Sequence, residues 1–258
     1  MAGNPDNAAV WGGADVLIAS VGTAIPTGNA AFAAATDERT ATVSTTSGSA
    51  TVTAGGATFN ATDVGATISG TGIPAGATII TYTSATSVTI SANATATGTP
   101  TATIGASVLG WHYAGLLDGG QGFEESIEQD STDHNAWGYG VIATTYGNTK
   151  VTKTFTALEE NSVVMGLVYD TESMTFDDTT GTYSGDLKVR DNTERLLVAF
   201  VTTSGTTERR LITKNYATVA ATAAGTESEE SLSSKGFTAT IVPDENRVLY
   251  YTYKGASA

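Results

Sequence analysis

The sequence contains no cysteine, and its 12 basic residues are outnumbered by 26 acidic ones. Disulfides and thiolate-ligated zinc both need cysteine, so a disulfide scaffold and a Cys-ligated zinc site are excluded. The formal net charge of −14 argues against binding to DNA or anionic lipid, because neutralising phosphates takes clusters of Lys and Arg. An acidic surface that only keeps the protein soluble explains the same charge.

Long hydrophobic runs are also missing. The first residues, Met1 to Asp6, include no basic residue and are not followed by an apolar stretch, so we expect no secretory signal. No apolar run reaches the roughly 18 residues that a membrane-spanning helix needs. We therefore expect a chain made in soluble form in a cytoplasm, without membrane contact.

Small and β-branched residues are abundant instead, and hydrophobic residues make up 40% of the 258-residue chain. This composition favours short strands and turns over long helices. The length suits one large β domain or two small ones with a real core.

The composition changes in the central part of the chain, which has almost no charged residues. Between Thr40 and Ile104 the only charged residue is Asp63. Polar and apolar residues alternate in 40–44, 49–53 and 86–91, the two-residue period of half-buried strands. We predict an inserted, Ig-like all-β module at 39–104 between two parts of a host domain, 1–38 and 105–258. One long, partly ordered surface loop is the alternative.

The stretch from Asp118 to Leu158 organises the host domain. A glycine-rich, acidic segment over 118–136 predicts a long loop, and 139–146 and 151–155 predict a hairpin around Gly147-Asn148. Apolar residues four apart over 161–169 predict a helix, capped by Thr156 or, if it starts later, by Asn161. Further strands are predicted at 14–20, 108–117, 186–190, 194–203, 208–214, 216–223, 237–242 and 247–253.

Catalytic and metal-binding patterns are weak. Two adjacent acid pairs, Glu159-Glu160 and Asp177-Asp178, raise the possibility of an acid-pair hydrolase, but neighbours on a strand point to opposite faces. A calcium site built from Asp177, Asp178, Asp186 and Asp191 lacks EF-hand spacing. We expect no enzymatic activity, no metal and no cofactor.

The order of several short motifs resembles the major tail tube proteins of long-tailed (siphovirus-type) bacteriophages, above all those infecting actinobacteria. These motifs are Trp11 to Ala19, Asp130 to Asp133, Ala136-Trp137, the hairpin and Leu158 to Asn161. The resemblance covers about 8–37 and 106–254. It implies a mainly β fold, a tail-tube-type antiparallel β-sandwich or barrel with one packed helix, and an inserted module that points outward.

The resemblance also implies a function and partners. The chain would be a structural subunit in stacked hexameric rings around an acidic channel, which conducts DNA without specific binding during genome ejection. Its partners would be further copies of itself, the tape measure protein inside the tube, and the tail terminator and distal tail proteins at the ends. It would be made in the host bacterial cytoplasm and located in the virion tail. The alternative is a secreted or surface carbohydrate-binding β module.

By the same resemblance, the acidic loop crosses to a neighbouring subunit, with Phe123, Ile127 and Trp137 as apolar anchors. Its other interface residues would be Glu124, Glu125, Glu128 and Asp130; a plainly solvated loop is the alternative. We expect Arg209 and Arg210 to pair with acids of the adjacent subunit, with intrachain pairing as the alternative. Candidate channel-lining acids are Asp186, Glu194 and Glu208.

Overall fold

The computed structural model describes residues 11–171, 173–177, 180–191, 193–222, 226–228 and 231–257. The predicted fold class is confirmed, since the described chain is mainly antiparallel β with one α-helix of seven residues. The chain forms two compact units: unit 1 comprises the described residues up to Ile18 and from Tyr113 onward, and unit 2 comprises Ala19–His112. Among the described residues, no helix is long and apolar enough to cross a membrane.

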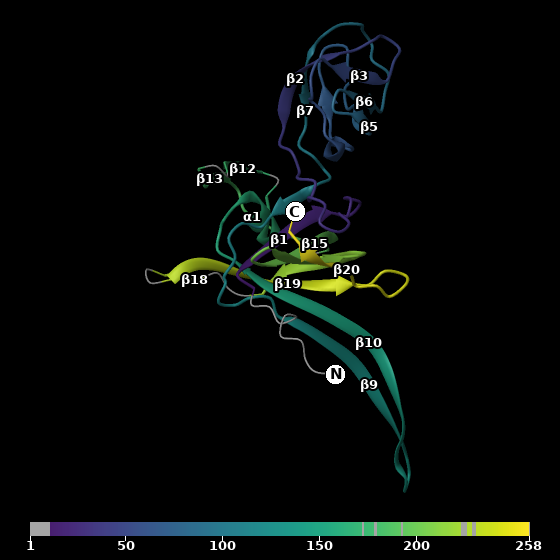
Figure 1. The fold of residues 1–258 in the computed structure, drawn as a ribbon, viewed down its shortest axis with the longest axis vertical. Helices are drawn as coiled ribbons and strands as arrows, with labels where there is room; N and C mark the ends of the chain where they lie inside the picture. Colours follow the sequence, from purple (N-terminus) through teal and green to yellow (C-terminus); the bar gives the residue numbers. More distant parts are fainter. Residues whose placement is uncertain are drawn as a thin grey trace. The chain divides into compact units, whose positions relative to one another are not determined.

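One large sheet dominates unit 1 (Figure 1). Its strands follow the order β20-β16-β15-β17-β19-β10-β9, with β1 beside β15 and β18 beside β19. The bounds are β1 (Gly13–Ser20), β9 (Glu125–Ala136), β10 (Gly140–Ala157), β15 (Leu196–Ser204), β16 (Thr207–Thr213), β17 (Tyr216–Ala221), β18 (Thr226–Ser228), β19 (Ser231–Val242) and β20 (Tyr250–Ala256). Two small sheets pair β11 (Tyr169–Asp170) with β14 (Lys188–Val189), and β12 (Met174–Asp177) with β13 (Thr182–Gly185). Strand β8 (Trp111–Tyr113) spans the boundary between the units.

The core of unit 1 is centred on β15, which is buried on both faces from Leu196 to Thr202. Three aromatic rings fill its middle: Phe155 stacks on Phe237 at 5.0 Å between centroids and meets Phe200 edge-on at 6.2 Å. Such aromatic pairs add stability beyond the area they bury. The continuous apolar run of β15 is therefore explained by packing on both sides.

The helix α1 (Ser162–Val168) confirms the predicted helix. Its N-cap is Asn161, whose side-chain oxygen accepts a hydrogen bond from the Val164 backbone N–H at 2.9 Å. Thr156, the other predicted cap, lies inside β10, so that prediction was wrong. Val164, Met165 and Leu167 are buried, whereas Val163 and Val168 of the predicted stripe are half-buried.

The predicted acidic loop was wrong in its structure: most of it forms strand β9. Pairing with β10 runs from Gly140 opposite Ala136 to Lys153 opposite Glu125. The turn lies around Gly138 and Gly140, both at positive φ (84° and 76°), and Gly147-Asn148 falls instead in a register irregularity between Tyr146 and Thr149. Water reaches both faces of β9 and of 140–150 in β10, so nothing imposed on them the alternation by which a strand is predicted.

Unit 2 contains a six-stranded sheet in the order β4-β7-β2-β3-β6-β5. The bounds are β2 (Arg39–Ser44), β3 (Thr51–Ala54), β4 (Ile68–Ser69), β5 (Ile79–Ser84), β6 (Ser87–Ile90) and β7 (Thr101–Ile104), with a 3-10 turn, η2, at Ala61–Asp63. Val43, Val52 and Val88 come from the predicted alternating segments and are buried in one core with Phe59. The predicted module, 39–104, lies within this unit.

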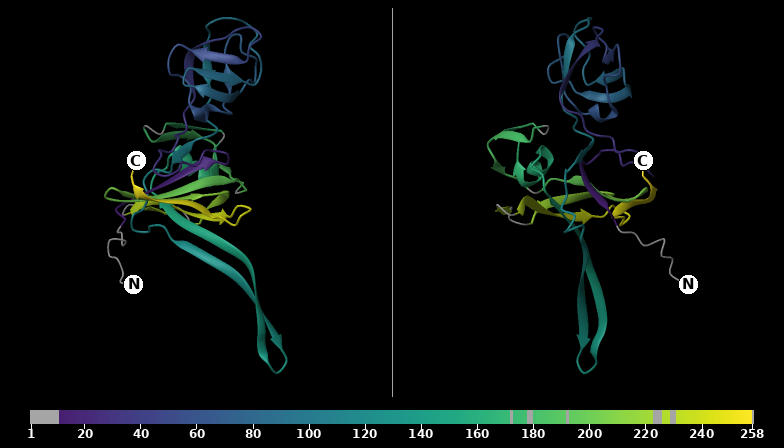
Figure 2. Two further views of the ribbon diagram at one scale, coloured as in Figure 1. Left: turned by 45° about the vertical axis from the view of Figure 1, so that its right-hand side comes forward. Right: turned by 60° about the vertical axis from the view of Figure 1, so that its left-hand side comes forward.

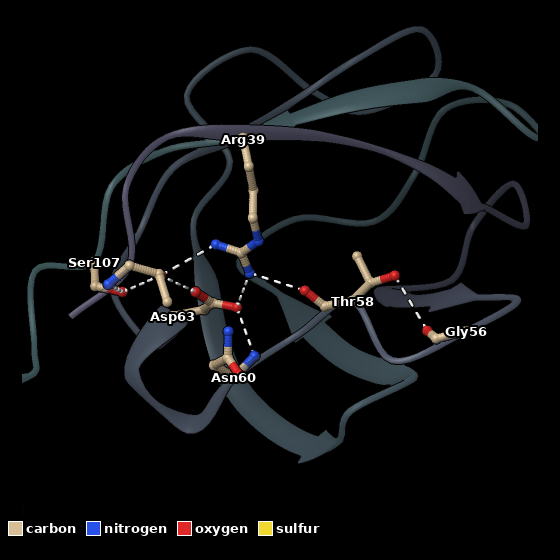
Figure 3. Close-up of polar contacts among 7 residues, drawn as sticks. Arg39, Gly56, Thr58, Asn60, Asp63 and Ser107 are labelled. Carbon is tan, nitrogen blue, oxygen red and sulfur yellow. Dashed lines mark hydrogen bonds and ion pairs between the residues drawn. The ribbon is translucent and has the colours of Figure 1, made fainter. Parts of the chain in front are cut away.

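A buried carboxylate, that of Asp63, links the segment that enters this sheet before β2 to the segment that leaves it after β7 (Figure 3). Asp63, whose side chain is fully buried, pairs with Arg39 at 2.5 Å and accepts hydrogen bonds from the Asn60 backbone N–H at 2.7 Å and the Thr36 hydroxyl at 3.1 Å. The Thr36 and Ser107 hydroxyls lie 2.6 Å apart. The single charge of the central segment is thus a structural group that ties the entry and exit of the module together.

Candidate functional site

The β9–β10 hairpin extends beyond the sheet of unit 1 (Figures 1 and 2). Strand β19 pairs with β10 only over Val151–Ala157, so 140–150 pair with β9 alone. Every residue of β9 from Glu125 to Asn135 is exposed, and no described strand pairs with its outer edge. An unpaired edge of this length is a template for pairing with another chain.

The end of the hairpin is apolar, and we call Trp137, Tyr139, Val141 and Ile142 the apolar tip. Trp137 is 104% exposed, Tyr139 86% and Ile142 64%. Ile127 and Tyr146 are also exposed further along the hairpin. Clustered exposed apolar residues of this kind mark interaction sites rather than ordinary surface.

The hairpin is acidic along its length. The register-paired hairpin, 125–153, contains four acids and two lysines, which gives a formal charge of −4 + 2 = −2. Glu128 lies opposite Lys150 in the strand register, whereas Asp130 and Asp133 have no opposing base on β10. The apolar tip is therefore carried on a negatively charged arm.

A cavity of about 410 Å³ lies at the base of the hairpin, and we call it the base cavity. It is lined by Trp11, Gly12, Gly13, Ala14, Asp15, Gly115, Leu116, Leu117, Asp118, Gly119, Gly122, Phe123, Thr156, Thr202 and Arg209. A Cβ added at Gly12, Gly119 or Gly122 would meet nothing within 4 Å. Backbone thus forms part of the wall, which leaves room for a large side chain or ligand.

The polar groups of the base cavity have distinct partners. The Arg209 guanidinium lies over the Trp11 ring at 5.0 Å, and the Lys254 ammonium lies 6.0 Å from the same ring. Partial burial, and secondarily the charge of Glu208, raise the pKa of Asp15. The hydroxyl of Thr202 is buried and has no hydrogen-bond partner among the described residues.

The predicted interface residues separate into two groups. Glu124, Ile127, Glu128, Asp130 and Trp137 are exposed on or beside the hairpin. Two others make contacts within their own unit: Phe123, which was predicted as an apolar anchor, and Glu125, which was predicted as an interface residue and is exposed. Phe123 is half-buried, packs edge-on against Phe200 at 5.3 Å and lines the base cavity. Glu125 pairs with Lys153 at 3.2 Å and accepts a hydrogen bond from the Tyr250 hydroxyl at 3.0 Å.

The two arginines of β16 point in different directions because neighbours alternate along a strand. Arg210 is 2% exposed and forms an ion pair with Glu208 of the same strand. The intrachain alternative therefore holds for Arg210, and its predicted pairing with another subunit was wrong. Arg209 faces Trp11 and the base cavity.

The candidate channel acids also differ from one another. Glu208 is 8% exposed and paired with Arg210. It therefore presents no free negative charge at the surface, and its prediction as a channel-lining acid is corrected. Glu194 pairs with Arg190 at 2.6 Å, and Asp186 is exposed. Whether Asp186 or Glu194 faces a channel stays a prediction.

The geometry gives little support to the acid-pair hydrolase and calcium-site hypotheses. Glu160 pairs with Lys235, and the hydrogen bond from Lys235, with a further one from Tyr183, lowers the pKa of Glu160. Glu159 instead lies near the Asn161 side-chain amide, at 3.3 Å. Among the described residues there is no group of three His, Asp or Glu that could hold a metal ion; Asp178, part of the calcium hypothesis, lies outside them.

A comparison of the chain with protein family models and with curated proteins finds no match. What the chain does is therefore inferred from its own residues. The base cavity escaped sequence reasoning because Trp11, Phe123 and Thr202 come together only in the fold. The one local signal was the glycine pair Gly12-Gly13, together with the glycines around Asp118.

Proposed function

We propose that the chain is a self-assembling structural protein, the subunit of a phage tail tube built from stacked hexameric rings. The observation that carries this proposal is the β9–β10 hairpin. It has an unpaired outer edge and an exposed apolar tip, and it has no packing role along most of its length. A solitary protein gains nothing from ordering such an arm, whereas a subunit gains a contact with its neighbour.

The sheet of unit 1 supports the same proposal. Its two ends, β9 and β20, are both open edges among the described strands. One surface can then meet a different surface of the next copy, and a head-to-tail contact that closes makes a ring. The resemblance of the sequence to tail tube proteins supplies the number six and the stacking of rings.

The charge of the chain fits passage of DNA without binding. Six copies carry formally 6 × −14 = −84. If free carboxylates line the bore, DNA is repelled from every side, whereas a basic bore would release counterions and bind. Weak affinity for DNA is in this proposal a requirement of the function.

Electron microscopy and sedimentation of the purified chain test the proposal. Gln129 and Thr149 face each other across the hairpin, so replacing 130–148 with Asn-Gly shortens it in register. We expect the full chain to form rings or tubes and the shortened chain to remain a folded monomer. Uniform monomers of the full chain at high concentration would refute the proposal.

A carbohydrate-binding β module is the second candidate, and the exposed rings of Trp137 and Tyr139 are the observation that favours it. Aromatic faces of this kind stack on sugars as well as on protein. A glycan array separates the two proposals: binding that is lost in Trp137→Ala, in a chain that does not associate with itself, would support this candidate.

A further inference from the structure

We propose that the base cavity of one copy binds the indole ring of Trp137 from a second copy. This inference rests on the proposed self-assembly and names the two surfaces that meet. Trp137 is the most exposed large apolar residue of the described chain. The base cavity is a recess with apolar walls from Trp11, Leu116, Leu117 and Phe123, and its polar groups are Asp15, Asp118, Arg209 and two threonines. Aromatic anchors that fill such recesses dominate the energetics of protein interfaces.

Trp137 cannot occupy the base cavity of its own copy. It lies beyond the start of β10, which has 18 residues, whereas Thr156 lines the cavity near the other end of that strand. At a rise of about 3.3 Å per residue the strand spans about 60 Å. Any contact between the two is therefore a contact between copies.

The shape of the base cavity suits an aromatic side chain. Its volume of about 410 Å³ lies within the range of small-molecule pockets and exceeds that of one indole ring. Gly119 and Gly122 present backbone to open space on one side, and Phe123, whose ring makes a T-shaped contact with Phe200, lines the cavity as well. A flat ring can thus lie between a backbone surface and an aromatic group.

A buried hydroxyl supplies the polar contact that an indole needs. Thr202 is 6% exposed, lines the base cavity, and has no hydrogen-bond partner for its Oγ1 among the described residues. A buried polar group of this kind calls for a partner. The indole N–H is a donor only, and when buried it usually finds an acceptor. Thr202 Oγ1 is closed to solvent in the single chain, so its side chain must rotate to turn the oxygen toward the ring. In that rotamer Thr202 Oγ1 is the acceptor that we assign to the indole.

Charge complementarity to the arm is confined to the Arg209 and Lys254 side of the base cavity. The register-paired arm that carries Trp137, 125–153, has a formal charge of −4 + 2 = −2. Arg209 and Lys254 lie at the Trp11 ring beside the cavity, whereas the acids Asp15 and Asp118 also line it. Opposite charges at the rim guide the approach of the arm more than they add to affinity. Since every copy carries one tip and one cavity, the contact repeats head to tail.

Cross-linking tests the contact directly, because the chain has no cysteine of its own. Ala136→Cys, which keeps the Trp137 indole next to it, is prepared separately and mixed with Gly119→Cys under mild oxidation. The matched controls are Gly56→Cys, where an added Cβ also meets open space, and Val189→Cys, at a residue that is 96% exposed. We expect the mixed disulfide with Gly119→Cys and none with either control.

Two conservative substitutions test the hydrogen bond by sedimentation velocity. Trp137→Phe keeps a ring but removes the donor, and Thr202→Val keeps the shape but removes the acceptor. Each should weaken association about three- to tenfold, and the double variant should be no weaker than the more affected single variant. Thr62→Val is the control, because the Thr62 hydroxyl of unit 2 is also buried and has no hydrogen-bond partner within the described part of the chain. It should leave association unchanged.

The outcomes keep this inference separate from the proposed function. Rings or tubes that form without the Gly119 cross-link, or additive effects of the two substitutions, would overturn the inference and leave the tube proposal standing. The specific cross-link in assemblies that are not tubular would support the inference and refute the tube. No association at all would overturn both.

Discussion

Removing the buried carboxylate of Asp63 should destabilise unit 2 selectively. The side chain of Asp63 is fully buried and receives three donors: the Arg39 guanidinium, the Asn60 backbone N–H and the Thr36 hydroxyl (Figure 3). Asp63→Ala leaves all three without their acceptor. It also leaves Arg39 without its ion-pair partner, although Arg39 keeps a hydrogen bond to the Thr58 carbonyl at 2.9 Å.

The expected loss follows from how far each group is from water. Breaking a fully buried ion pair by removing one partner costs about 3–5 kcal/mol. The Arg39 side chain is 26% exposed, so water can solvate part of the stranded guanidinium and reduce the penalty. We therefore expect a loss of about 2–3 kcal/mol in the free energy of unfolding of unit 2.

Hydrogen exchange followed by mass spectrometry measures this loss in the full chain, one segment at a time. Peptides from β2, β3, β6 and β7 should exchange roughly 30- to 150-fold faster in Asp63→Ala if their amides open by unfolding of the unit. Peptides from β15 and β19 in unit 1 serve as the internal reference. Asp133→Ala is the matched control, since Asp133 is an exposed acid on the hairpin.

Two results would refute this reasoning. Unchanged exchange in unit 2 would mean that the ion pair and its hydrogen bonds contribute nothing net. Equal acceleration in β15 and β19 would mean that the effect is not local to the module.

Three further predictions concern the helix, an ion pair and the module. Asn161→Ala removes the N-cap of α1 and should lower the free energy of unfolding by about 1 kcal/mol in urea titrations, whereas Asn161→Asp should lose little. Glu160→Gln should destabilise the chain at pH 7, because the ionised Glu160 is the form stabilised by Lys235; the difference from wild type should shrink as the pH falls below the ordinary pKa of 4.5 and through the lowered one. A pH-independent difference would contradict this ionic origin. Replacing 40–104 with a short Gly-Ser bridge should leave assembly intact, and a folded chain that no longer assembles would refute an outward-facing module.

The helix and the core strands were predictable because packing imposes local patterns. Val164 and Val168 lie four apart behind a capping asparagine, and the run from Leu196 to Val201 is apolar because both faces of β15 are covered. Strand β9 was not predictable in the same way. Its residues face water on both sides, so its acids and serines fit a loop equally well.

Contacts between residues far apart in the sequence were the other feature that could not be predicted from the sequence. The pairing of Glu208 with Arg210 had a local signal, since residues two apart share one face of a strand. The base cavity had no comparable signal, because it is assembled from five separate parts of the chain: 11–15, 115–123, Thr156, Thr202 and Arg209. Only the fold shows that Phe123 forms its wall while Trp137 stands free.

The acids of β9 have a consequence for storage of the unassembled protein. Two copies that tried to join along their open β9 edges would bring Glu128, Asp130 and Asp133 of one strand close to the same residues of the other. Repulsion between these acids disfavours edge-to-edge pairing of the two β9 strands. High ionic strength screens this repulsion, so concentrated solutions of the protein should form off-pathway aggregates more readily in high salt than in low-salt buffer.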